Sequence, residues 1–134
     1  LGWFLWEADH EGKKSAITGK REGNVMKFET RSTGTYELDQ DLQKPIISIV
    51  SRTPSARPNS NFQQLLVRAA DDKTGVDRYS ARIDGEFVRI DFDYKQELLK
   101  VIVPKDIPAG NHNLRVVVID GVGNTTVEEY SITL

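Results

Sequence analysis

The C-terminal third of this chain most limits the folds that it can adopt. Asn113–Asp120 contains a nearly continuous apolar run, and the Gly/Asn-rich stretch Gly121–Asn124 separates it from a second strand-forming segment, Thr125–Leu134. A short apolar run between turn residues is typical of a buried strand, and Gly and Asn favour tight hairpin turns. The segment therefore predicts two antiparallel strands, the first of them central in its sheet, and points to an all-β domain.

Turn residues recur at short intervals through the preceding sequence, and the segments between them are rich in β-branched and aromatic residues. Asp77–Ile83 alternates apolar and charged residues, as expected for a sheet with one face in water. The Asp84-Gly85 pair that follows predicts a two-residue hairpin. Seven strands are predicted: Ile46–Ser51, Gln63–Ala70, Asp77–Ile83, Glu86–Phe92, Leu98–Val103, Asn113–Asp120 and Thr125–Leu134.

Seven strands with this spacing predict an immunoglobulin-like or fibronectin-III-like β-sandwich over residues 42–134. The Cys…Trp…Cys signature of antibody domains is absent, because the chain has no cysteine. Residues 1–41 contain only three or four short candidate strands around a polar, turn-rich segment, Lys13–Lys20, and this is too little for an independent core. We expect them to be the end of an upstream β-domain or to pack on the sandwich. Because the chain opens on Leu1-Gly-Trp-Phe-Leu-Trp6, we also expect it to be a fragment of a larger protein.

Composition excludes several functional classes. The 134 residues carry a formal net charge of −2 without a strongly basic segment, which argues against nucleic-acid binding. No apolar run approaches the roughly 20 residues of a membrane span. With no cysteine and two histidines, the chain offers no transition-metal cluster, and no serine lies in a nucleophile-elbow motif. We predict a protein that is not an enzyme and has no cofactor.

Carboxylates at strand ends are the first candidates for a binding site. In the predicted sandwich the turns after the second and the sixth strand lie at the same end, so Asp71, Asp72, Asp120 and Asn124 could converge on a calcium ion, which takes six to eight oxygen ligands. The alternative is that these side chains cap the backbone N–H groups of their own turns. A second possible calcium site is formed by Asp39 and Asp41 at the domain boundary.

Aromatic residues are the second set of candidates. On a strand Phe4 and Trp6 share one face and Trp3 lies on the other, so an exposed, coplanar Phe4/Trp6 pair could stack on a sugar ring. The alternative is that these rings fill an interface between the N-terminal strands and the sandwich. His112, in the loop before a strand, is expected to hold that loop by a hydrogen bond.

Several motifs in a fixed order resemble a known class of module. They are Gly34-Thr-Tyr-Glu-Leu-Asp-Gln-Asp41 before Pro45, Asp72-Lys-Thr-Gly-Val76, Ile83-Asp-Gly85, Pro108-Ala-Gly-Asn-His112 and Asp120-Gly-Val-Gly-Asn124. Over Gly34–Leu134 this order is similar to the Ig-like modules of bacterial surface and periplasmic proteins. It resembles above all the non-catalytic C-terminal region of Bacteroidetes lysostaphin-like zinc peptidase family proteins. The His-x3-Asp and His-x-His motifs of the peptidase itself are absent from this sequence.

The resemblance implies a non-catalytic structural or interaction module of an exported protein, in the periplasm or at the surface of a Gram-negative bacterium. It would act as a spacer that positions a cell-wall-associated enzyme or a surface assembly. Its expected partners are upstream domains of the same polypeptide, and a cell-wall or surface glycan or protein. Carbohydrate binding through Phe4 and Trp6, and a calcium-stiffened linker, are the two alternative functions.

Overall fold

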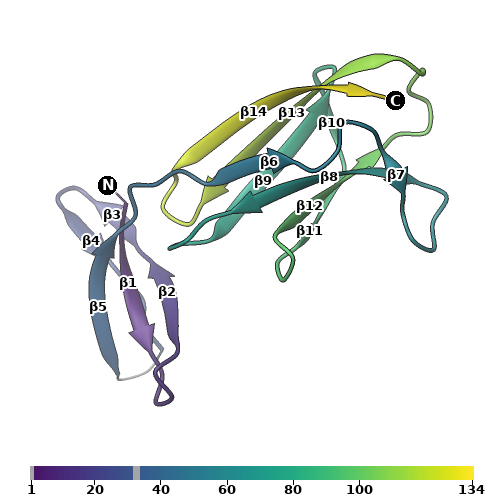
Figure 1. Ribbon diagram of the computed structural model, residues 1–134. Helices are drawn as coiled ribbons and strands as arrows, with labels where there is room; N and C mark the ends of the chain where they lie inside the picture. The colour runs from purple at the N-terminus through teal and green to yellow at the C-terminus, as the bar shows by residue number, and fades with distance from the viewer. Residues whose placement is uncertain (1, 32–33) are drawn as a thin grey trace.

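The chain folds into β-strands alone over the residues that the structure describes. The computed structural model describes residues 2–31 and 34–134, so Leu1, Ser32 and Thr33 lie outside the described residues. These residues form fourteen strands and no helix, and hence no helix that is long and apolar enough to cross a membrane. Figure 1 shows an elongated molecule in which a small element, strands β1–β5, lies at one end of a larger region, strands β6–β14.

Two antiparallel sheets make up the larger region. In spatial order, the first sheet contains β10 (Glu86–Val88), β9 (Val76–Ile83), β13 (Asn111–Asp120) and β14 (Thr125–Thr133). The second contains β11 (Ile90–Asp93), β12 (Leu98–Val103), β8 (Gln63–Ala70) and β6 (Ile46–Ile49), and the short β7 (Ser55–Ala56) pairs with β8. The two sheets pack face to face, which is the arrangement of a β-sandwich.

Alternation along the strands builds the core between the sheets. On β13, Leu114, Val116 and Val118 are fully buried, whereas Arg115 between them is exposed. The strand lies between β9 and β14, as expected for a central strand, but its outer face is open to solvent. The buried core residues of both sheets are Ile47, Leu65, Val67, Ala69, Ala81, Ile83, Leu99, Val101, Val103, Leu114, Val116, Val118 and Ile132.

The predicted strand Glu86–Phe92 is divided between the two sheets. Val88 pairs with Ala81 in the first sheet, and two residues later Ile90 pairs with Val101 in the second. The apolar alternation of Val88, Ile90 and Phe92 does not reveal this crossing, because each of these side chains packs against the same core. With this division and the addition of β7, the region after Pro45 has nine strands where the sequence predicted seven.

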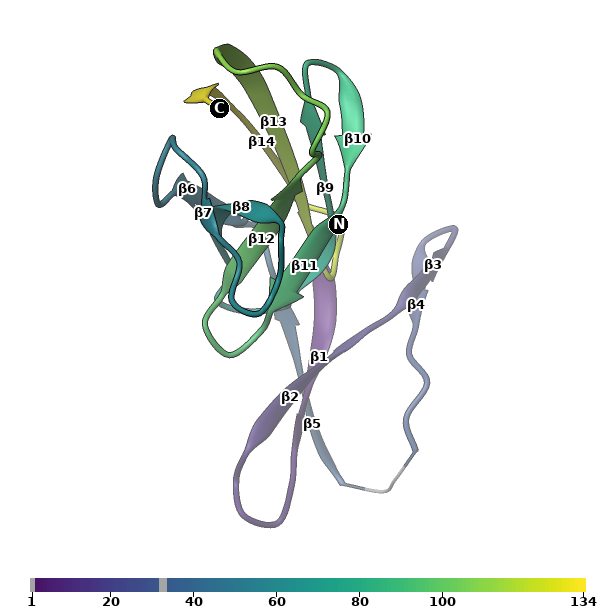
Figure 2. The same ribbon diagram turned by 90° about the vertical axis from the view of Figure 1, so that its right-hand side faces the viewer.

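The N-terminal element consists of a three-stranded sheet and a hairpin. The sheet has the order β2 (Lys14–Thr18), β1 (Trp3–Ala8), β5 (Thr35–Gln40), and β3 (Lys20–Glu22) pairs with β4 (Val25–Lys27). The prediction of a turn-rich Lys13–Lys20 was therefore wrong, because this polar segment pairs with β1 as an edge strand. None of the described strands in this element pairs with a strand of the sandwich, and Figure 2 shows that the two regions approach each other only at one end.

The N-terminal element has little core of its own. Phe4 is fully buried, but Trp3 is 38% exposed, and Val25 and Leu38 are each 57% exposed. A three-stranded sheet with one buried aromatic side chain gains little from hydrophobic burial. Its position therefore depends on the contacts at the end of the sandwich.

Candidate functional site

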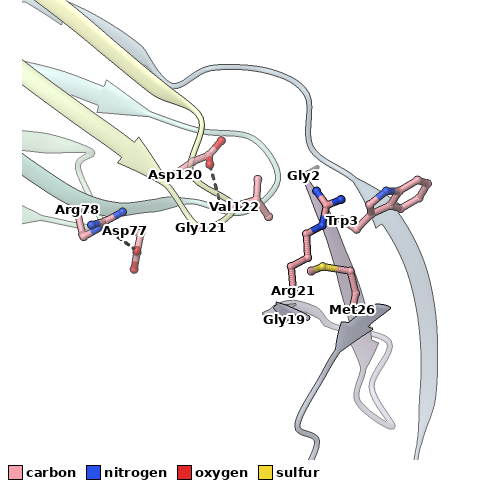
Figure 3. Close-up of a pocket in the computed structure, with 11 residues that line it drawn as sticks. Gly2, Trp3, Gly19, Arg21, Met26, Asp77, Arg78, Asp120, Gly121 and Val122 are labelled. Carbon is pink, nitrogen blue, oxygen red and sulfur yellow. Dashed lines mark hydrogen bonds and ion pairs between the residues drawn. The ribbon is translucent and has the colours of Figure 1, made fainter. Parts of the chain in front are cut away.

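The candidate site lies where the N-terminal element meets the sandwich. Three segments converge there: the link between β5 and β6, the β8–β9 turn and the β13–β14 turn. Beside them is a hollow of about 320 Å³, which residues of both regions line. Figure 3 shows Arg21 and Met26 of the N-terminal hairpin on one side of this hollow and Asp120 and Val122 on the other.

Asp71 organises the β8–β9 turn. One of its carboxylate oxygens, Oδ1, accepts hydrogen bonds from the backbone N–H groups of Lys73 (3.3 Å), Thr74 (3.1 Å) and Gly75 (3.1 Å). A short carboxylate side chain at the end of a strand can accept from several N–H groups that the turn would otherwise leave unpaired. These hydrogen bonds hold the backbone of Thr74 within the turn and so limit where its side chain can lie.

Asp120 organises the β13–β14 turn in the same way. Its Oδ1 accepts from the N–H groups of Val122 (3.0 Å) and Asn124 (2.9 Å), and its Oδ2 accepts from the Asn124 side-chain amide (2.9 Å). Gly121 is required by close packing, since a Cβ atom there would lie 2.8 Å from the Thr74 carbonyl oxygen. The two turns are thus in direct contact.

Asp41 joins these two turns to the N-terminal element, and its side chain is 1% exposed. Its Oδ2 accepts from the Thr74 hydroxyl (2.7 Å), and its carbonyl oxygen accepts from the Asn124 side-chain amide (2.9 Å). Its own N–H donates to the carbonyl of Gly2 at 2.7 Å. One buried residue therefore holds the start of β1, the β8–β9 turn and the β13–β14 turn.

Lys73 adds a second connection between the two regions. Its ammonium group lies 3.3 Å from an oxygen of Asp39 and donates to the carbonyl of Gln40 at 3.0 Å. The other oxygen of Asp39 accepts from the Trp6 indole N–H at 2.9 Å. This hydrogen bond from Trp6, followed by the one from the Gln40 backbone, lowers the pKa of Asp39 below its ordinary value.

The carboxylates of Asp41, Asp71 and Asp120 form a cluster, each offering an oxygen within 4.8 Å of the others. Burial, and then the charges of Asp41 and Asp120, raise the pKa of Asp71 to about 6. No lysine or arginine among the described residues forms an ion pair with any of the three. Such a cluster can be relieved by a proton on Asp71, or by a divalent cation with oxygen ligands.

The structure brings together parts of the two calcium sites that the sequence suggested. Asp71 and Asp120 from the first and Asp41 from the second lie in one cluster, whereas Asp72 is exposed and outside it. Asn124 lies beside the cluster, where its amide N–H₂ group donates hydrogen bonds that connect the two regions. The bond between Asp41 and Thr74 was missed, because the two residues are 33 positions apart and no local pattern marks them.

Phe4 and Trp6 do not form an exposed aromatic platform. Phe4 is fully buried, and the Trp6 ring meets it edge to face, with ring centroids 5.0 Å apart and an interplanar angle of 75°. The half-buried Trp6 is also held by its bond to Asp39. The coplanar, exposed pair that sugar stacking requires is therefore not present, and the two rings pack against each other within the N-terminal element.

His112 holds its loop, as the sequence predicted, at the opposite end of the sandwich. Its Nδ1 contacts the Asp84 carboxylate and its Nε2 lies 2.7 Å from the carbonyl oxygen of Pro108. Since a carboxylate and a carbonyl only accept, this arrangement is fully hydrogen-bonded when both ring nitrogens carry protons. The hydrogen bond to Asp84 and the one to Pro108 raise the pKa of His112.

No protein-family model matches this chain, and no curated protein matches it either. The functional reading therefore rests on the residues and on their geometry.

Proposed function

We propose that this protein is a non-catalytic structural module of an exported bacterial protein, with an Ig-like sandwich that acts as a rigid spacer. In this proposal residues 1–41 continue an upstream β-domain, and the sandwich of residues 42–134 positions that domain, or a cell-wall-associated enzyme, relative to a surface assembly. The bacterial, exported setting comes from the order of sequence motifs. The spacer role comes from the junction.

One observation carries the proposal: the buried Asp41 connects both regions through its side chain and its backbone. A flexible linker leaves its polar groups to water, whereas here the side chain of Asp41 is 1% exposed and its groups are bonded to Gly2, Thr74 and Asn124. Buried hydrogen bonds that are fully satisfied specify one arrangement, because a different arrangement leaves buried groups unpaired. Such a junction suits a module whose task is to hold its neighbour at a fixed angle.

The exposed apolar side chains of the N-terminal sheet support the second part of the proposal. Trp3, Leu5, Ile17 and Leu38 point to the same face of that sheet, as the cross-strand register shows, and Leu38 is 57% exposed. This face is half-buried at Leu5 and Ile17 and exposed at Trp3 and Leu38. A small sheet that leaves apolar side chains exposed on one face is the expected appearance of part of a larger β-domain.

Residual dipolar couplings measured by NMR test the rigid junction. We expect the couplings of residues 2–31 and of residues 46–134 to fit one common alignment tensor. In the Asp41→Ala variant the tensors should separate, because the Thr74 hydroxyl loses the carboxylate that accepts its hydrogen bond across the junction. Asp72→Ala, an exposed neighbour outside the network, should leave them common. Two independent tensors in the unmodified protein would show that the junction is flexible and that the spacer proposal is wrong.

A calcium-stiffened linker is the second candidate, and the carboxylate cluster of Asp41, Asp71 and Asp120 favours it. Calcium would bridge carboxylates from both sides of the junction and replace their repulsion with attraction. Thermal melts in Ca²⁺ and in EGTA at pH 7.5 separate the two candidates. A higher midpoint in Ca²⁺ that Asp71→Asn abolishes supports the calcium form, and an unchanged midpoint leaves the metal-free spacer.

A further inference from the structure

A second hollow, of about 320 Å³, opens at the end of the sandwich opposite the junction. It lies between β10 and the loop that joins β12 to β13. Figure 1 shows β10 at the end of the sandwich away from strands β1–β5. The apolar residues Val88, Ile107 and Pro104 line it together with the acidic residues Glu86 and Asp106. Its volume matches the lower end of the range for small-molecule and side-chain pockets, about 300 Å³.

One wall of this hollow is fixed before any ligand arrives. His112, which lines it, is held at both ring nitrogens by Asp84 and by the carbonyl of Pro108, and its side chain is 12% exposed. Asp84 also accepts from the backbone N–H of Asn113 at 2.9 Å. The β9–β10 turn and the β12–β13 loop are thereby joined, so a ligand would not have to organise them.

The charge of the hollow is negative and uncompensated. Among the described residues that line it, His112 is the one basic residue, and it is already paired with Asp84. Arg82 is outside the lining, with its guanidinium 4.0 Å from the centroid of the Phe87 ring. Glu86 and Asp106 are exposed, and neither forms an ion pair with any residue that the structure describes. Lys105, next to Asp106 in sequence, instead places its ammonium group over the ring of Phe62, 4.7 Å from the centroid.

We propose that this hollow binds a lysine or arginine side chain presented by a protein partner. The aliphatic stem of such a side chain fits between Val88, Ile107 and Pro104, and its cationic head reaches the carboxylates of Glu86 and Asp106. Long basic side chains bury their methylene groups on apolar surface while the charged end stays near water. An anionic ligand would be repelled by the two carboxylates, and a purely apolar ligand would leave them without a cationic partner.

Chemical-shift mapping on the 134-residue protein tests the proposal. The probes are Nα-acetyl-lysine N-methylamide, the arginine analogue, and the norleucine analogue, which keeps the aliphatic chain without the charge. We expect the two cationic probes to shift the amide signals of Val88, Asp106 and Ile107 in a saturable manner. The norleucine probe should bind at least several-fold more weakly.

Variants of the two acidic residues sharpen this test. Glu86→Gln and Asp106→Asn should each weaken the cationic probes about threefold, the effect of losing one exposed charge pair. Glu128→Gln, which removes an exposed charge on β14 outside the hollow, is the matched control and should change nothing. Glu86→Gln and Asp106→Asn each keep a surface side chain of nearly the same size as the original. An unchanged thermal midpoint in each variant shows that its fold is intact.

Three results would overturn the proposal. Equal binding of the norleucine probe would mean that the hollow is merely apolar, and absence of saturable shifts with either cation would mean that it is not a site. Equal loss in Glu86→Gln and in Glu128→Gln would mean that only the net charge of the protein matters.

Discussion

The two regions of this protein use the same kind of element but obtain their stability in different ways. The sandwich encloses thirteen buried hydrophobic residues that come from both of its sheets. The N-terminal element has strands of three to six residues, encloses one fully buried aromatic side chain, Phe4, and leaves Leu38 and Val25 more than half exposed. Strand pairing alone therefore does not make an independent domain; a second layer is needed to bury one face of the sheet.

The difference also explains why the polar network is at the junction and not inside the sandwich. The sandwich is held by apolar packing, which has no preferred direction. The N-terminal element is positioned by directional bonds from Asp41, Lys73 and Asn124. Directional bonds fix an angle better than they supply stability, since one hydrogen bond contributes a net ~1 kcal/mol.

The largest expected effect contrasts one substitution in the two regions. Leu114→Ala removes a fully buried side chain between the sheets and should lower the free energy of unfolding by about 2–5 kcal/mol. Leu38→Ala makes the same chemical change at a position that is 57% exposed and should change it by less than about 0.5 kcal/mol. Urea unfolding followed by tryptophan fluorescence and by circular dichroism measures both. Equal effects would mean that the N-terminal sheet is packed as well as the sandwich.

Truncation tests whether the sandwich is independent. Residues 42–134 alone should fold cooperatively, with a free energy of unfolding about 1–3 kcal/mol lower than that of the whole chain, because Thr74 and Asn124 lose the partners that Asp41 supplies. Thermal unfolding monitored by circular dichroism checks this. An unfolded or aggregated product would mean that the N-terminal strands belong to the same folding unit as the sandwich. The domain boundary before residue 42 would then be wrong.

Sequence reasoning predicted the parts of the fold that depend on local patterns. The turn at Asp84-Gly85 was predicted because Asp and Gly tolerate positive φ, and the structure confirms it, with φ of 51° and 86°. Strand β8, Gln63–Ala70, has the predicted bounds because its buried and exposed residues alternate. The edge strand β2 was missed because it is polar, and its pairing with β1 depends on a neighbour in space.

The candidate site could be predicted only in part for the same reason. Asp71 and Asp120 were recognisable as turn-capping residues at strand ends, and both do cap their turns. That Asp41 lies between them depends on the path of the five-residue link, residues 41–45, between β5 and β6. The sequence suggested two separate acidic groups, and only the tertiary structure shows that they form one cluster.

A smaller effect on stability is expected from the negative charge of the carboxylate cluster of Asp41, Asp71 and Asp120. Asp71 has a pKa of about 6 in the folded protein against about 3.9 in the unfolded chain. Between these values the folded state binds more protons, so stability should fall as pH rises from about 4 to about 6 and stay lower above that. Asp71→Asn keeps an oxygen for the turn N–H groups and should raise the midpoint at pH 7.5 in EGTA.

Thermal melts between pH 4 and pH 8 measure this dependence. Asp72→Asn, an exposed neighbour in the same turn, is the control and should keep the pH dependence of the unmodified protein. A lower midpoint of Asp71→Asn at pH 7.5 would show that the negative charge of Asp71 stabilises the junction, contrary to the expectation.

The smallest expected effect is local and lies at the far end of the sandwich. The pKa of His112 is raised, chiefly by its bond to Asp84, so its contribution is present below about pH 6.5 and is lost as pH rises through the folded pKa. The pKa of Asp84 is lowered, first by the N–H of Asn113 and then by His112, so its contribution is lost only as the solution becomes strongly acidic. The pair is therefore expected to hold the β9–β10 turn from mildly acidic to near-neutral pH.

NMR titration of the His112 ring, compared between the unmodified protein and Asp84→Asn, measures this contribution directly. Asparagine tolerates the positive φ of 51° at this position and keeps an oxygen for the N–H of Asn113. The substitution therefore removes the negative charge and the oxygen that faces His112 Nδ1. The pKa of His112 should fall in this variant, while the thermal midpoint at pH 7.5 should barely change, because the pair is open to solvent and salt screens it. An unchanged pKa would mean that the carbonyl of Pro108, and not Asp84, keeps the ring protonated. In that case the loop would be held from one side only, unlike the junction, where Asp41 is bonded on every side.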